Sequence, residues 1–212
     1  MNRLWSSLAV VSLCMVALIG ASCGTSSGKS DKPPAQSVTL NPASLKKAPY
    51  EKGEIVILGT PVPVMVEAET TTEGFKIISK VEGSPYEEEM YFADDATLRF
   101  AGTDVESFTP PIPLIAQPFE VPGEWTWAGT MKFAGKEFKA SADLKSSKET
   151  LNLPGGPYDS FRIDAELSMQ DPGGSIGKRK LSFWMTEQEG IIKREFAQSS
   201  TRLPVGSTNS ES

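Results

Sequence analysis

The chain of 212 residues contains no histidine and only two cysteines. The absence of histidine removes the commonest general base at neutral pH and the commonest side-chain ligand of transition metals. Positive charge is also scarce, since 21 Lys and Arg residues stand against 27 Asp and Glu residues, for a formal net charge of −6. A nucleic-acid-binding face must be positive to match phosphate, so this balance argues against a nucleic-acid partner. We expect no metal, no cofactor and no catalytic residues.

The N-terminus carries an apolar run that is too short to span a membrane. This run covers residues 8–19 (LAVVSLCMVALI) and follows Arg3, which supplies a positive start. Its 12 residues fall short of the roughly 17–25 that a transmembrane helix needs. Small residues follow at 20–22 (GAS), as a signal peptidase requires. Residues 1–22 are therefore predicted to be a cleaved signal peptide.

The five residues around the second cysteine form a recognisable pattern. Residues 19–23 (IGASC) resemble the lipobox of bacterial lipoproteins through Ala21, Ser22 and Cys23, whereas Gly20 stands where the family usually has leucine. The resemblance implies that the Cys23 thiol is joined to a diacylglycerol, that cleavage falls just before it, and that the new amino group is acylated. The alternative is an ordinary signal peptide followed by a chance cysteine.

The cysteine count agrees with a lipid anchor. Cys14 lies inside the apolar run and would leave with it, so Cys23 would be the only thiol of the mature chain and no intrachain disulfide could form. Acyl chains contribute about 0.8 kcal/mol of membrane affinity per buried methylene group. We expect Cys23 to attach the protein to a membrane of the cell envelope. If the source has two membranes, lipoprotein resemblance with Gly24 after the cysteine implies the outer membrane or a location facing the periplasm.

Composition divides the rest of the chain into three parts. Residues 23–44 are rich in Ser, Gly, Thr and Pro and are predicted to be the acylated cysteine and a flexible tether. Within this segment, Asn41-Pro42 has the sequence of a helix N-cap. Residues 45–198 should form one β domain, and residues 199–212 are polar and predicted to be a disordered tail. Cleavage before Cys23 would remove Arg3 and no acidic residue, which changes the net charge from −6 to −7.

Alternation of apolar and polar residues dominates the predicted domain. The pattern is clear in residues 125–133, 138–145 and 161–170, with turn residues between the runs. Strands with one apolar and one polar face are typical of antiparallel sheets. We expect an all-β fold, an antiparallel and strongly curved sheet or half-barrel of about ten strands with at most one short helix. Residues 109–118, of which four are proline, are expected to be an extended connection rather than a central strand.

The C-terminal half resembles a family of uncharacterised bacterial envelope proteins, the TapB-like proteins. The resemblance is carried, in order, by residues 111–114 (PIPL), 119–127 (FEVPGEWTW), 153–163 (LPGGPYDSFRI), 183–185 (FWM) and 189–194 (EGIIKR). The chain departs from the family at residues 187–190, where only the second Gly of a Gly-x-Gly hairpin is kept, and at the Gly156-Pro157 insertion. The resemblance implies a curved antiparallel sheet in the cell envelope and implies no activity.

Four large apolar residues share one face of a predicted strand and are the candidate binding residues. They are Trp125, Trp127, Met131 and Phe133. They are either ordinary core, since aromatic side chains dominate core burial, or the lining of a cavity for an apolar ligand on the concave face of the sheet.

Several charged or glycine-rich stretches are given structural explanations. Residues 87–89 (EEE) are expected to be a solvated acidic face rather than a calcium site. Residues 173–178 (GGSIGK) are expected to be a hairpin loop. The basic residues 178–180 and 193–194 would form a surface patch if their two strands pair.

These observations favour a lipid-anchored envelope lipoprotein with a non-catalytic β domain. Its expected role is to bind an unidentified envelope protein or to support envelope assembly. The alternative is binding or carriage of a lipid on the concave face. A hydrolase is the least favoured hypothesis, because the sequence shows no nucleophile with a neighbouring base.

Overall fold

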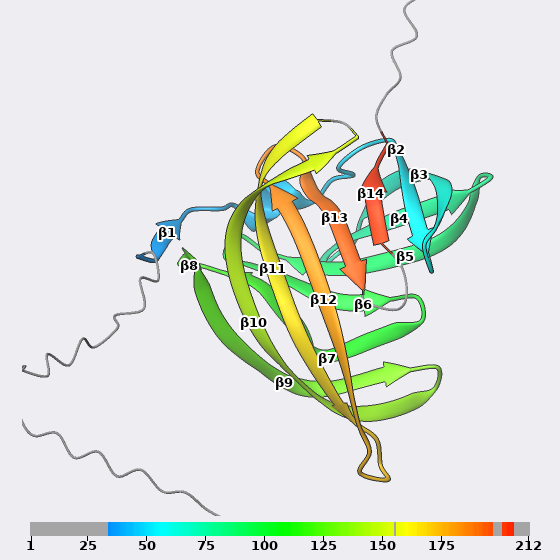
Figure 1. The fold of residues 1–212 in the computed structure, drawn as a ribbon, viewed down its shortest axis with the longest axis vertical. Helices are drawn as coiled ribbons and strands as arrows, with labels where there is room; N and C mark the ends of the chain where they lie inside the picture. The colour runs from blue at the N-terminus through cyan, green and yellow to red at the C-terminus, as the bar shows by residue number, and fades with distance from the viewer. Residues whose placement is uncertain (1–33, 155, 197–200, 206–212) are drawn as a thin grey trace, which may run out of the picture. The chain divides into compact units, whose positions relative to one another are not determined.

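The computed structural model describes residues 34–154, 156–196 and 201–205, which form fourteen strands and one 3₁₀ helix. Twelve of the strands close into an antiparallel barrel (Figure 1). The barrel strands are β2 (Lys52–Ile57), β3 (Thr60–Thr70), β4 (Gly74–Val81), β5 (Ser84–Ala93), β6 (Thr97–Thr103), β7 (Glu106–Ala116), β9 (Gly123–Phe133), β10 (Lys136–Leu153), β11 (Gly156–Gln170), β12 (Ile176–Thr186), β13 (Gly190–Phe196) and β14 (Thr201–Pro204). The all-β, antiparallel and strongly curved fold is confirmed, with a closed barrel and more strands than expected.

Neighbours along the chain are neighbours in the barrel, with two exceptions. Strand β7 pairs with β9 because β8 (Phe119–Val121) leaves the barrel and pairs with β1 (Gln36–Val38). Strand β14 pairs with β2, and this contact joins the two ends of the strand sequence. The disordered tail predicted for residues 199–212 is therefore wrong for Thr201–Pro204, which complete the barrel wall.

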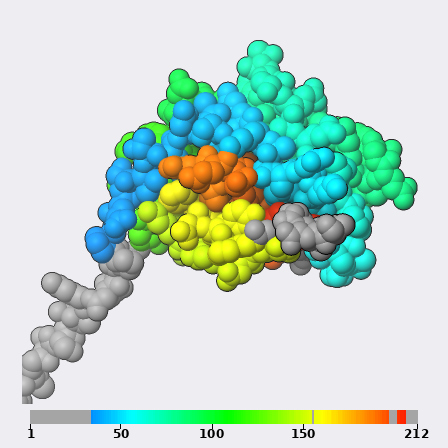
Figure 2. Space-filling view, turned by 90° about the horizontal axis from the view of Figure 1, so that it is seen from above, coloured from blue at the N-terminus to red at the C-terminus, as the bar shows by residue number. Residues whose placement is uncertain are grey.

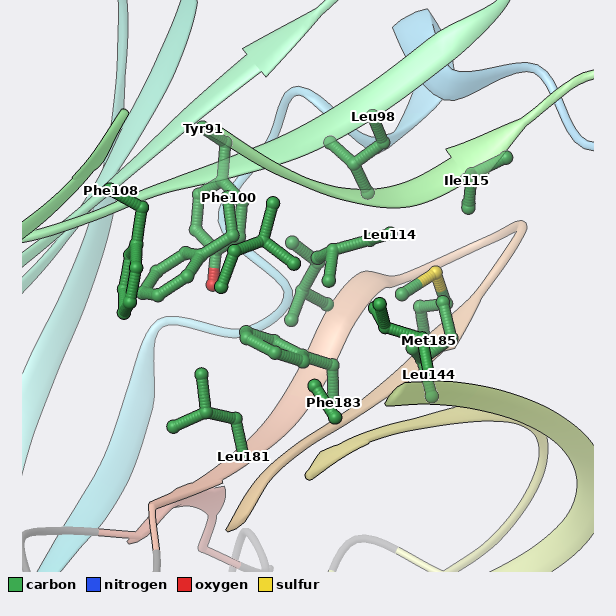
Figure 3. Packing of buried hydrophobic residues seen from close by; sticks show 14 of the residues in the cluster. Tyr91, Leu98, Phe100, Phe108, Leu114, Ile115, Leu144, Leu181, Phe183 and Met185 are labelled. Carbon is green, nitrogen blue, oxygen red and sulfur yellow. The ribbon is translucent and has the colours of Figure 1, made fainter. Parts of the chain in front are cut away.

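The interior of the barrel is filled by side chains that alternate inward along each strand. In β10, Ala140, Ala142 and Leu144 are buried while the residues between them are exposed. Large aromatic rings meet in the middle (Figure 3). The ring of Phe100 in β6 lies 5.1 Å from that of Phe183 in β12, measured between centroids. Strands from opposite parts of the barrel therefore touch through their side chains, which makes the domain one packed core.

The segment before β2 closes one end of the barrel. The 3₁₀ helix η1 (Pro42–Leu45) begins as the sequence predicts, with the Asn41 side chain accepting a hydrogen bond of 3.0 Å from the amide of Ala43. Leu40 and Leu45 are 1% and 0% exposed. The flexible tether expected over residues 23–44 is thus wrong for the described residues near η1, because burial of these leucines offsets the chain entropy that the polar composition suggested.

We call the end of the barrel that holds η1 and β8 the capped end. Seen from above in Figure 2, the turn between β12 and β13 (orange) lies between the η1 segment (blue) and the end of the β10–β11 hairpin (yellow). The Lys47 ammonium group donates a hydrogen bond to the carbonyl of Gln188 in that turn. A Cβ atom on Gly190 would lie 3.3 Å from the Leu45 carbonyl oxygen, so the helix and the turn pack closely. Among the residues that the structure describes, we find no helix long and apolar enough to cross a bilayer.

Residues 109–116 of the proline-rich stretch are part of a barrel strand, contrary to the expectation that residues 109–118 form an extended connection. It belongs to β7, which lies between β6 and β9, and its backbone pairs with β9 only from Glu106 to Thr109. Beyond that point the indole N–H of Trp127 donates to the carbonyl of Pro110 at 3.0 Å, and that of Trp125 donates to Pro113 at 2.9 Å. Prolines lack the N–H that would donate to a neighbouring strand, but their carbonyl groups can still accept, and here two tryptophan side chains of β9 donate to them.

Candidate functional site

The four predicted binding residues do not share one environment. Trp127 and Met131 are 6% and 2% exposed and belong to the core. Phe133 is 43% exposed and stands at the far end of β9, next to the β9–β10 turn. Trp125 lies at the beginning of β9, partly buried, at the capped end. Only Trp125 of these four residues lines the pocket described next, and the predicted lipidation site, Cys23, lies outside the described residues.

Trp125 forms one wall of a pocket at the capped end with a volume of about 300 Å³. The pocket lies where β7 and β9 have stopped pairing and β8 has left the barrel. Its lining consists of Pro113, Ala116, Pro118, Phe119, Glu120, Gly123, Glu124 and Trp125. The pocket is therefore mostly apolar, with two carboxylates among its lining residues.

Contacts within the barrel hold the Trp125 ring in place. Its indole N–H is used in the hydrogen bond to Pro113, which leaves the ring carbons as its contribution to the pocket. The Trp125 ring also packs edge-on against Phe119, with 6.2 Å between the ring centroids. Phe119 in turn packs edge-on against Phe161 of β11 at 6.1 Å. The aromatic wall is thus fixed by contacts from β7, β8 and β11.

Hydrogen bonds also fix the backbone between β8 and β9 in place. The Ser146 hydroxyl of β10 donates to the carbonyl of Glu120 at 2.7 Å and accepts from the amide of Gly123 at 2.8 Å. A Cβ atom at position 123 would lie 2.6 Å from the Glu120 carbonyl oxygen, so only glycine allows this close approach. Glu120 and Glu124, on either side of this turn, line the same pocket as Trp125, and both glutamates are exposed.

A second constellation, which we call the buried charge cluster, lies inside the barrel and consists of Glu87, Glu89, Arg194, Arg202 and two tyrosines, Tyr50 and Tyr91. Glu89, Arg194 and Arg202 are all 0% exposed. The Nε atom of Arg202 lies 2.6 Å from Oε1 of Glu89, and that of Arg194 lies 3.6 Å from the same oxygen. The Arg194 guanidinium also pairs with Glu87. The cluster joins β5 to β13 and β14.

Hydrogen bonds with two tyrosine side chains complete the cluster. Tyr91 donates to Oε2 of Glu89 at 2.5 Å, and the Tyr50 hydroxyl accepts from Nη1 of Arg202 at 2.7 Å. Burial would raise the pKa of Glu89, but the charges of Arg194 and Arg202 and the hydrogen bonds that Arg202 and Tyr91 donate to Glu89 outweigh it and hold that pKa below its usual value. Burial raises the pKa of Tyr50 to about 12 despite the nearby Arg202.

The buried charge cluster corrects two expectations from the sequence. Residues 87–89 are not a solvated acidic face, because Glu89 points into the barrel and only Glu88, which pairs with Lys76 at 2.9 Å, faces outward. Strands β12 and β13 do pair, but the basic residues do not gather into one surface patch. Arg194 is buried, and Arg179 points inward, with its Nη2 atom 2.5 Å from Oε2 of Glu106.

The chemistry of the cluster is structural. Its charged groups are matched by opposite charges and removed from water, so they hold strands together rather than meet a dissolved substrate. Within the described part of the chain, no group of three or more Cys, Asp or Glu side chains is placed to hold a metal ion. The Trp125 pocket is the better candidate for a functional site because solvent can reach it.

Comparison of the chain with protein-family models, with curated proteins and with solved structures finds no match. The case for a function therefore rests on the structure of the barrel and on the N-terminal sequence.

Sequence reasoning found one residue of the pocket and missed the others. Trp125 was identified from its alternating strand, but Pro113, Phe119 and Glu120 were not. These residues come together because β8 leaves the barrel between β7 and β9. The alternation of Phe119, Glu120 and Val121 indicates a short strand, yet no local pattern reveals that its partner is β1.

Proposed function

We propose that this protein is a lipid-anchored lipoprotein of the bacterial cell envelope whose non-catalytic barrel binds a protein partner at its surface. The observation that carries the proposal is the filled interior of the barrel. Phe100 contacts Phe183 and Phe196 across the core, with centroids 5.1 and 5.6 Å away, at the place where a carried lipid would have to lie. A barrel filled in this way offers its rim and outer surface for binding.

The anchor in this proposal is the acylated Cys23. Twelve residues, 24–35, lie between Cys23 and Gln36, the first residue of β1. An extended chain of that length reaches at most about 45 Å. Because β1 pairs with β8, the chain enters the barrel at the capped end, beside the Trp125 pocket. The barrel would therefore bind its partner close to the membrane.

The anchor is tested by comparing the wild-type protein with Cys23→Ser in its native host. We expect wild-type protein in the membrane fraction, with an N-terminal peptide whose mass includes acyl chains. Cys23→Ser should be either released in soluble form or left uncleaved. Cys14→Ser is the matched control, because this cysteine lies in the predicted signal peptide and its loss should leave membrane retention unchanged. Equal retention of the Cys23→Ser protein, fully processed, would exclude an acyl anchor.

Lipid carriage is distinguished by a separate measurement. Native mass spectrometry of protein released gently from its membranes should show only the covalent acyl chains if the barrel binds a protein. A stoichiometric, non-covalent lipid in the same spectrum would favour carriage over partner binding.

A further inference from the structure

We propose that the end of the barrel opposite the capped end contacts the surface of a lipid bilayer and inserts one apolar side chain from each of five hairpins. This inference goes beyond the proposed function, from which it takes only the location of the chain at a membrane. It is supported by the placement of exposed apolar residues, the conformation of one turn, the free edge of one strand and the length of the tether.

Large exposed apolar residues gather at one end of the barrel. Because neighbouring strands are antiparallel, the turns after β2, β4, β6, β9 and β11 all lie at the end away from β1 and β8 (Figure 1). Each of these five hairpins carries, in or next to its turn, one large apolar residue that is between 43% and 86% exposed. We call these residues the apolar rim: Leu58, Tyr86, Val105, Phe133 and Ile176.

The turns at the capped end are polar in comparison. Residues 71–73 (TTE), 94–96 (DDA) and 187–189 (EQE) connect strands there. Among the large apolar residues that are exposed in the described part of the chain, only Met65 and Val205 lie outside the apolar rim. Single exposed apolar residues are common on protein surfaces. Their presence at five hairpins of the same end indicates a contact surface.

The fold does not explain why a leucine occupies position 58. Leu58 is 86% exposed, so it buries little area, and its backbone φ of 49° lies in the left-handed region. Tight two-residue turns with positive φ favour Asn, Asp or Gly, because a larger side chain is disfavoured there. Two other hairpins have Glu82 and Ala134 at the equivalent position. A leucine that is both exposed and conformationally unfavourable points to a contact outside the chain.

The hairpin that carries Leu58 is apolar along its whole length. Residues 55–66 (IVILGTPVPVMV) include no charged residue. Strand β3 pairs with β4 only from Met65 onward, so residues 60–64 have a neighbour on one side alone, in β2. The other edge of this part of β3 is free. A free edge in water normally invites the addition of another strand.

Two prolines remove hydrogen-bond donors from this free edge. Bonded and non-bonded residue pairs alternate in an antiparallel ladder, and the pair next to a two-residue turn, here Ile57 and Thr60, is a bonded one. Pro61 and Pro63 therefore occupy positions whose amide groups would point away from β2. An edge of this kind resists the addition of a peptide strand, and it has fewer amide groups to strip of water in an apolar medium. The edge thus favours lipid over a strand of a partner protein.

The ring of rim residues suits a flat, fluid surface. Its members come from successive pairs of strands around the barrel, so they are separate side chains rather than the walls of one groove. Lipid hydrocarbon adapts to separate side chains, whereas a protein partner must match their shape. Both signs of charge occur beside the rim, with Lys132 next to Phe133 and Asp104 next to Val105. We therefore expect burial of the apolar side chains, rather than net charge, to drive the contact.

The tether is long enough to bring Cys23 and the apolar rim to the same membrane. The chain enters the barrel at the capped end through β1. Strand β9 runs from that end to the rim with 11 residues, which span about 35 Å along the strand. Strands of a barrel are tilted, so the barrel is shorter than this. The extended reach of about 45 Å between Cys23 and β1 exceeds that length.

The inference is tested with the mature chain, residues 23–212, carrying Cys23→Ser, which leaves no cysteine and no acyl anchor. A single substitution, Thr60→Cys beside Leu58 or Thr72→Cys at the capped end, then carries an environment-sensitive fluorophore. The probe is a vesicle of phosphatidylcholine. We expect the chain to sediment with concentrated vesicles in low and in high salt, and we expect a blue shift of the label at position 60 only.

This binding should be reversible and lost on dilution. One weak membrane signal gives only marginal attachment, and stable attachment takes two. The apolar rim would be the second signal beside the acyl chains. Release of Cys23→Ser protein from washed membranes therefore agrees with binding of the same chain to concentrated vesicles.

Substitutions in the rim make the test specific. Leu58→Asn combined with Ile176→Ser should weaken vesicle binding at least tenfold. The unfolding midpoint should not fall, because both side chains are exposed and Asn suits a positive φ. The matched control is Val205→Asn, which removes an exposed apolar side chain at the capped end and should leave binding unchanged.

Four results would overturn the inference. Equal vesicle binding by the Leu58→Asn, Ile176→Ser variant would remove the role of the rim. Binding that requires phosphatidylglycerol and disappears in high salt would assign the contact to charge. Dimerisation that is abolished by Leu58→Asn would assign the rim to a second copy of the chain, and no binding to vesicles would leave it to a protein partner.

The rim and the anchor can fail separately. Vesicle binding is measured without acyl chains, so it does not depend on the modification of Cys23. Rim-dependent binding of a chain whose Cys23 is found unmodified in its host would contradict the anchor alone. An acylated Cys23 without rim-dependent binding would contradict this inference alone.

Discussion

Arg202 and Glu89 lie 113 residues apart in the chain and form an ion pair inside the barrel, with 2.6 Å between Nε and Oε1. Both residues are fully buried. Arg202 belongs to β14, the last strand, and Glu89 belongs to β5, which is not its neighbour in the barrel wall. The pair therefore ties β14 through the interior to a strand that lies beyond β2, β3 and β4 in the barrel wall.

Removal of one partner of this pair should be strongly destabilising. Arg202→Met leaves Glu89 buried with less compensating charge, so we expect a loss of about 3–5 kcal/mol in the free energy of unfolding. Urea denaturation followed by tryptophan fluorescence measures this loss. The control is Lys80→Met, which breaks the solvated Lys80–Glu67 pair at 2.6 Å and should cost about 0–1 kcal/mol. Similar losses of unfolding free energy in the two variants would mean that breaking the buried Arg202–Glu89 pair costs no more than breaking a solvated pair.

Stability should also depend on pH through Glu89. Its pKa in the folded protein lies below the ordinary value of 4.5, so its contribution is complete above about pH 4.5 and is lost as the pH falls through the folded pKa. Other carboxylates titrate in the same range, so the informative quantity is the difference between wild type and Glu89→Gln. We expect this difference in unfolding free energy to shrink as the pH is lowered below 4.5. A difference that stays constant down to pH 2 would show that Glu89 does not titrate in this way.

The last strand should be essential for folding, although its sequence looks like a polar tail. A chain that ends at residue 200 lacks β14 and leaves Glu89 without Arg202, and β2 without one of its two neighbours. We expect this variant to lose cooperative unfolding, as measured by circular dichroism during heating. The control chain ends after Val205 and keeps β14. Cooperative unfolding of the shorter chain at an unchanged temperature would contradict a structural role for this strand.

The two tryptophans that bridge β9 to β7 should differ in their effect on stability. Trp127→Ala removes a ring that is 6% exposed and should cost about 3–5 kcal/mol. Trp125→Ala removes a ring that is only partly buried at the pocket, so we expect a smaller loss. Chemical denaturation of both variants tests the order. A larger loss at Trp125 would place that ring in the core rather than at a binding surface.

Much of the fold follows from local patterns. The alternation in residues 161–169 predicts a strand, and these residues belong to β11. The alternating burial of their side chains confirms which of them face inward. Turn residues such as those at 171–174 are hairpin turns in the structure. The prediction for the prolines of β7 was wrong because it considered only the N–H groups that prolines lack. The carbonyl groups of Pro110 and Pro113 still accept hydrogen bonds, and the donors are Trp127 and Trp125 on another strand.

The all-β class and the antiparallel pairing of consecutive strands could be predicted from the amino-acid sequence, because each depends on residues within a short stretch of chain. The burial of Glu89, the closure of the barrel by Thr201–Pro204 and the pocket that Trp125 and Glu120 line could be found only in the folded protein. The physical reason is that burial and charge pairing depend on residues far apart in the chain, such as Glu89 and Arg202, which become neighbours only after the barrel has closed.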